Sequence, residues 1–144
     1  MVEAGVSDLK ATMARIIDEG FNQGDMDALD RLISDDFVEH EDLPPGVQQG
    51  KAAPLAMITM MRAAFPDLHV TVEEMLQDGN KVVTRSRFAG THEGEFMGIP
   101  PTGNKFDVPV IDIIDFREGK AVAHWGVMDN AAMMEQLGVA GPPA

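Results

Sequence analysis

The chain has 144 residues, with no cysteine, no tyrosine and a formal net charge of −13 at pH 7, because 24 acidic residues outnumber 11 basic ones. Without cysteine there are no disulfides, thiolate metal sites or cysteine nucleophile, and so few basic residues leave no face suited to nucleic-acid phosphates. The length favours a single domain over residues 1–144. No apolar run approaches the ~18 residues of a membrane span, and a signal-peptide pattern is absent. We therefore expect a cytoplasmic protein with no nucleic-acid or membrane partner.

The first half of the chain predicts three helices. Ser7 can cap the first, and the second begins at Asp25. The apolar stripe of the first helix consists of Leu9, Met13, Ile16, Ile17 and Phe21. A short extended segment at 37–40 and a loop with two prolines at 41–50 precede the third helix, which is expected at about 51–65.

From Leu68 the apolar period changes to two, which indicates strands. We expect strands from 68, at 82–91, 106–116 and 121–128, with a hairpin turn at Asp78-Gly79-Asn80 and a last helix at 130–137. Helices followed by a strand meander predict an α+β fold, in which helices cover one face of a curved antiparallel sheet. The hollow under such a sheet is the expected ligand pocket.

The stretch from Phe88 to Asp129 contains most of the candidate site, since it combines apolar strands, a Gly/Pro-rich loop and several titratable groups. Asp129 follows the last strand, where it can act as a general base, cap the next helix, or do both. His124 precedes it by five residues, so in a regular strand the two side chains point to opposite faces unless a bulge occurs at Gly126. His124 then points into the pocket or into an interface.

Two other histidines complete the candidate catalytic set of Asp129, His40, His92 and His124. His40 lies either in a solvated loop or in the site, and His92 either shapes the Gly-rich loop or reaches a ligand. Neither a His-x-His nor an HExxH spacing supports a metal, and no cofactor-binding fingerprint occurs, so we expect neither. The expected substrate-pocket residues are Phe37, Phe65, Phe96, Met97, Ile111, Ile113 and Trp125. Arg85 and Arg87 share a sheet face and are expected to point outward or to pair with acidic neighbours such as Asp112.

Several segments resemble the SnoaL-like polyketide cyclases of the nuclear-transport-factor-2-like superfamily. They are AFPDL at 64–68, GTHEGEF at 90–96, GIPPTG at 98–103, HW at 124–125, and Asp129 followed by QLG at 136–138. The resemblance implies a cone-shaped α+β barrel that associates through its open sheet face, as a homodimer or tetramer. It also implies cofactor-free closure of a polyketide ring by aldol condensation, with an aspartate matching Asp129 as acid/base and an enolate stabilised by the substrate's conjugation.

The leading hypothesis is therefore a cofactor-independent cyclase or isomerase acting on an apolar, carbonyl-rich small molecule. His40 or His92 would polarise or reprotonate the oxygen. One alternative is an epoxide hydrolase-like site built from Arg87, Asp112 and Asp129, although the tyrosine that such relatives use is missing. The other is a small-molecule-binding or dimerisation module without chemistry, which pocket polarity would distinguish.

Overall fold

A five-stranded curved sheet forms one layer of the protein, seen in a computed structural model that describes residues 9–139. Its strands are β1 (Ile33–Glu39), β2 (His69–Asp78), β3 (Lys81–Thr91), β4 (Lys105–Arg117) and β5 (Lys120–Met128). The spatial order is β1-β5-β4-β3-β2. The four later strands form an antiparallel meander, whereas β1 runs parallel to β5 at the edge. The parallel edge strand differs from the expected all-antiparallel sheet. Strands β1 and β5 are separated in the chain by α4 and β2–β4, so no hairpin turn imposes an antiparallel pairing on them.

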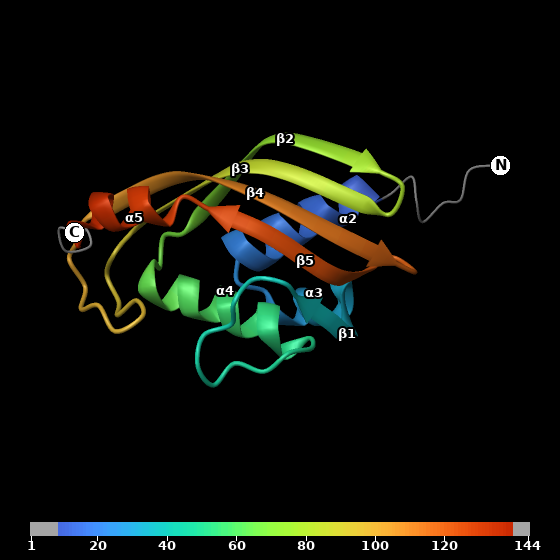
Figure 1. Ribbon diagram of the computed structural model, residues 1–144, viewed down its shortest axis with the longest axis horizontal. Helices are drawn as coiled ribbons and strands as arrows, with labels where there is room; N and C mark the ends of the chain where they lie inside the picture. Colours follow the sequence, from blue (N-terminus) through green and yellow to red (C-terminus); the bar gives the residue numbers. More distant parts are fainter. Residues whose placement is uncertain (1–8, 140–144) are drawn as a thin grey trace.

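Helices cover one face of this sheet (Figure 1). They are α2 (Leu9–Arg15), which continues as the π-helical turn η1 (Ile16–Asn22), then α3 (Met26–Leu32) and α4 (Ala52–Ala64). The short helix α5 (Asn130–Leu137) follows β5 and packs at the end of the sheet. The predicted α+β class with helices on one sheet face is confirmed.

Local signals account for where these helices begin and end. The Asp25 carboxylate accepts a hydrogen bond from the Ala28 N–H at 3.0 Å and so caps α3, as the sequence predicts. Gly20 lies in the π-helical turn, where a Cβ would come within 2.6 Å of the Leu29 side chain, so the glycine permits close packing of α3. The predicted cap Ser7 lies outside the described residues. Among residues 9–139, no helix is both long and apolar enough to cross a membrane, and the cellular location stays a prediction.

The strands present two chemically different faces. The inner face, toward the helices, carries buried side chains such as Val82, Phe88 and Val108. The outer face carries Arg85 and Arg87, as predicted from their alternation, but their partners are Glu73, Glu74 and Asp107 rather than Asp112. Strand β1 also begins at Ile33, four residues before the expected start, because polar side chains at 34–36 mask the alternation there.

Candidate active site

A cavity of about 550 Å³ lies between the inner face of the sheet and the helices. Most of its wall is apolar. This part of the wall includes Met13, Ile17 and Phe21 from α2 and η1, Met57, Ile58 and Met61 from α4, Phe88, Val110 and Ile114 from the sheet, and Leu43, Pro44 and Pro45 from the loop after β1. The described residues that line the cavity include no lysine or arginine. A small apolar molecule fits such a wall.

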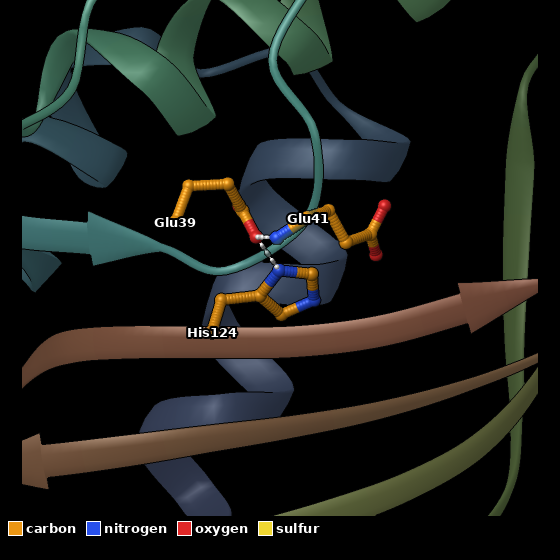
Figure 2. Close-up of side chains that lie close together, drawn as sticks. All are labelled: Glu39, Glu41 and His124. Atoms are coloured by element: carbon orange, nitrogen blue, oxygen red, sulfur yellow. Dashed lines mark hydrogen bonds and ion pairs between the residues drawn. The ribbon is translucent and has the colours of Figure 1, made fainter.

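A charged cluster interrupts this apolar wall at one place. His124 on β5 lies between two carboxylates, with its Nδ1 2.7 Å from Glu39 Oε2 and its Nε2 2.7 Å from Asp112 Oδ1. Glu39 ends β1 and Asp112 lies on β4, so the two neighbours of β5 supply the two carboxylates. Figure 2 shows the Glu39 carboxylate meeting both the His124 ring and the backbone N–H of Glu41. The cluster therefore joins three strands at the cavity wall.

These contacts determine the protonation of His124. Burial alone would lower the pKa of the imidazole, but the hydrogen bonds to Asp112 and Glu39, together with their negative charge, outweigh it and raise the pKa to about 10. Two carboxylates can both accept hydrogen bonds from one imidazole only when both of its nitrogens carry protons. His124 is thus an imidazolium at neutral pH and the only cationic side chain among the described residues of the cavity wall.

Glu41 adds a third carboxyl group beside this imidazolium. Burial raises the pKa of Glu41, and the negative charges of Glu39 and Asp112 act in the same direction, while His124 acts against them. Among the described residues, no hydrogen bond to the Glu41 carboxylate is found. The loop that carries Glu41 is held to β1 because the Gln49 side chain bonds both the N–H and the carbonyl of Glu39, each at 2.9 Å. Glu41 is therefore a positioned, unengaged carboxyl group at the cavity.

Gly126 explains how the charged groups can approach one another. A Cβ at this position would lie 2.6 Å from Asp112 Oδ1 and 2.8 Å from His124 Nε2, and would collide with Glu41 Oε1. Asp112 and Gly126 are regular cross-strand partners, so no bulge occurs at the glycine. The missing side chain leaves the space into which the three groups converge.

The same cluster also brings three possible metal ligands close together. One ligand atom from each of Glu39, Glu41 and His124 lies within 4.8 Å of the other two. A histidine ligand, however, must offer a lone pair, and both nitrogens of His124 face carboxylates in a group whose pKa is about 10. The donor set favours a proton over a metal ion at neutral pH.

The structure brings only one of the four predicted catalytic residues to the cavity wall, namely His124. His40 is exposed and stacks on Trp125, with ring centroids 4.4 Å apart. His92 is fully buried behind the Gly-rich loop, where its Nδ1 accepts a hydrogen bond from the Thr102 N–H and its backbone binds both Gly103 and Asn104. Asp129 is exposed and its carboxylate caps α5 by accepting from the Ala132 N–H at 3.0 Å.

The predicted substrate-pocket residues divide in the same way. Phe37, Phe96 and Met97 line the cavity. Phe65 is fully buried and packs against His92, Phe96 and Phe106 instead. Ile111, Ile113 and Trp125 lie on the other face of the sheet, because they alternate with the inward residues Asp112, Ile114 and His124.

Sequence reasoning did not select Glu39 and Glu41 for the site, and it named Asp112 only in the epoxide hydrolase-like alternative. Asp112 has the same strand parity as Val108 and Val110, and Glu39 has that of Phe37, so strand alternation is the signal that could have placed both on the inner face. The facing of His124 depends on a strand irregularity between Asp115 and Phe116, opposite the first residues of β5. Strand alternation places Arg87 on the outer face and Asp112 on the inner face, so the charged part of an epoxide hydrolase-like site is not assembled.

An apolar cavity with a few converging polar groups, in an α+β fold whose helices cover one sheet face, is typical of a small-molecule pocket. The sequence model of the SnoaL-like polyketide cyclases matches residues 11–137. The chain is 27% identical over 119 residues to a nogalonic acid methyl ester cyclase of Streptomyces nogalater, covering 82% of this chain and 89% of that protein. It is 29% identical over 134 residues to the aklanonic acid methyl ester cyclase DauD of Streptomyces sp. (strain C5), covering 88% and 80%.

A solved structure, IdmH from Streptomyces antibioticus, is 38% identical and superposes with a TM-score of 0.77, covering 91% of this chain and 99% of that one. Together these similarities span nearly all of the described residues. The protein belongs to the SnoaL-like polyketide cyclase family, which confirms the prediction from its motifs.

Proposed function

We propose that this protein closes a ring in a polyketide by an intramolecular aldol reaction, with Glu41 as the acid-base group. The observation that carries this proposal is the unengaged Glu41 carboxyl, whose pKa is raised by burial at the wall of an apolar cavity. A general base is most effective when its pKa is close to the working pH. The two methyl ester cyclases similar to this chain support a polyketide substrate.

The reaction needs only proton transfers and one new carbon–carbon bond. The Glu41 carboxylate removes a proton from a carbon α to a carbonyl, and the resulting enolate carbon adds to a second carbonyl of the same molecule. The alkoxide formed there accepts a proton from the Glu41 carboxylic acid, which returns the group to its starting state. Neither an oxidant nor a reductant is consumed.

His124 and its two carboxylates have a supporting role in this scheme. Both ring nitrogens already bond Glu39 and Asp112, so His124 acts mainly by its positive charge, which offsets negative charge that develops on the enolate in a low-dielectric cavity. Asp129 caps α5 and does not line the cavity, so in this proposal it is a structural residue.

The test is turnover of aklanonic and nogalonic acid methyl esters by Glu41→Gln. We expect a loss of about 10²–10⁴-fold in kcat, the usual contribution of a positioned acid-base group. Asp42→Asn is the matched control, since Asp42 is the next residue, also lines the cavity and is exposed. Asp42→Asn and Asp129→Asn should retain most of the activity. Full turnover by Glu41→Gln, or loss only in Asp129→Asn, contradicts the assignment.

A further inference from the structure

Ser86 on β3 carries a buried hydroxyl group that the acid-base scheme does not use. The residue is 1% exposed, its side chain lines the cavity, and its Oγ has no hydrogen-bond partner. A buried polar group without a partner is destabilising, so such groups are rare and call for an explanation. A hydroxyl that faces a ligand cavity is satisfied when a ligand oxygen or N–H occupies the adjacent space.

The strand register fixes where Ser86 lies relative to the charged cluster. Ser86 is paired with Val110 on β4, and Thr84 is paired with Asp112. Ser86 and Asp112 are therefore diagonal neighbours on the inner face, a relation that places side chains ~7–8 Å apart in a sheet. Val110 and Phe88 provide apolar surface next to Ser86. The floor of the cavity thus has two separate polar points on an apolar surface.

We propose that Ser86 is a second polar anchor, which binds a carbonyl or hydroxyl oxygen of the substrate away from the reacting carbonyl. The inference rests on the proposed function, since the first anchor is the cluster of Glu41, Asp112 and His124. It deepens that function by defining the substrate class. The substrate is an apolar ring system with a second oxygen ~7–8 Å from the site of proton transfer, the spacing of diagonal neighbours in a sheet. Ser86 binds and orients the substrate and takes no part in the proton transfers.

Thr84 supplies a matched control within the same strand and on the same face. It is fully buried and its hydroxyl also has no hydrogen-bond partner, but it does not line the cavity. Ser86→Ala and Thr84→Val both remove an unpaired buried hydroxyl. We expect the Tm of each variant to be unchanged or raised, so that a difference in ligand binding between them does not come from a difference in folding.

The first experiment is an NMR titration of the wild-type protein and both variants with 1,4-naphthoquinone and with naphthalene. The two probes share a ring skeleton and differ in their carbonyl oxygens, and the chain has no cysteine to react with the quinone. We expect the wild type to prefer the quinone, and Ser86→Ala to weaken quinone binding about tenfold, the size of one lost hydrogen bond, with naphthalene binding unchanged. Thr84→Val should resemble the wild type.

Three results overturn the proposal that Ser86 is an anchor. In the first, the wild type shows no preference for the quinone, which includes binding neither probe. In the second, Ser86→Ala keeps the wild-type preference. In the third, Thr84→Val loses as much quinone affinity as Ser86→Ala. Because the titration involves no turnover, its outcome is independent of the acid-base assignment. Loss of kcat in Glu41→Gln with normal quinone binding in Ser86→Ala removes the anchor alone. Weaker quinone binding in Ser86→Ala with full turnover by Glu41→Gln removes the acid-base assignment alone.

Discussion

The two faces of the sheet carry ion pairs of the same length in very different surroundings. On the outer face, Arg87 Nε lies 2.7 Å from Asp107 Oδ1, and the two side chains are 41% and 60% exposed. On the inner face, His124 Nε2 lies 2.7 Å from Asp112 Oδ1, and both side chains are 17% exposed. Water screens the outer pair, which is worth ~0–1 kcal/mol at most. The inner contacts raise the pKa of His124 to about 10.

The faces also differ in how their charges balance. On the outer face, Arg85 contacts both Glu73 and Glu74, and water solvates whatever charge remains. On the inner face, three carboxyl groups, Glu39, Glu41 and Asp112, meet a single imidazolium, and the described cavity wall offers no other cation. Burial, together with the negative charges of Glu39 and Asp112, raises the pKa of the Glu41 carboxyl on this face. Burial, more than distance, therefore determines how far an ion pair shifts the pKa of its members.

The largest effect that we expect comes from Gly126→Ala, which tests whether the inner cluster depends on its geometry. The added methyl group would overlap the space shared by Glu41, Asp112 and His124, so at least one group must move. A displacement of ~1 Å at a catalytic site costs about 10²-fold in rate. We expect at least that loss of kcat, and an NMR titration of His124 should show its pKa moving down toward 6.5.

Ile111→Val is the control for this substitution, because Ile111 adjoins Asp112 on β4, is exposed on the outer face and does not line the cavity. It should leave both kcat and the His124 titration unchanged. If Gly126→Ala keeps the wild-type rate and the wild-type His124 titration, the inner cluster tolerates rearrangement and the contrast between the two faces does not hold.

A smaller but still large effect is expected in the pH dependence of stability. The pKa of His124 is raised from 6.5 to about 10 on folding. The resulting stabilisation is fully present below pH 6.5, because the group is then protonated in both states, and it is lost as the pH rises through about 10. We expect the free energy of unfolding, measured by urea denaturation, to fall by roughly 3–5 kcal/mol across this window.

His124→Gln should remove most of this slope, whereas His69→Gln should not, since His69 is exposed on β2. Equal slopes in the two variants would mean that groups other than His124 determine the alkaline loss of stability. That result would remove the main energetic difference between the inner and outer faces.

Helix caps and turns in this fold could be predicted from the sequence, because each depends on residues that are adjacent in the chain. The caps by Asp25 and Asp129, the hairpin at 78–80 and the helix Asn130–Leu137 follow from neighbouring residues. The charged cluster around His124 could not be predicted in this way. Glu39 and His124 are 85 positions apart, and they meet because β1 lies parallel to β5, a pairing that no short motif records. The strand irregularity near Asp115 then sets which face His124 occupies.

The smallest effect concerns the outer face itself and comes from Arg87→Ala. Both partners of the Arg87–Asp107 pair are exposed, so we expect the free energy of unfolding to change by about 0.5 kcal/mol or less and turnover to be unaffected. A loss well above 1 kcal/mol would show that the pair is shielded from water in solution. Such shielding fits the predicted association of copies through this sheet face, and light scattering at several protein concentrations distinguishes it from a stronger pair within one chain. If Arg87→Ala changes the free energy of unfolding only slightly, whether the protein is an oligomer or a monomer, burial remains the property that distinguishes the two faces.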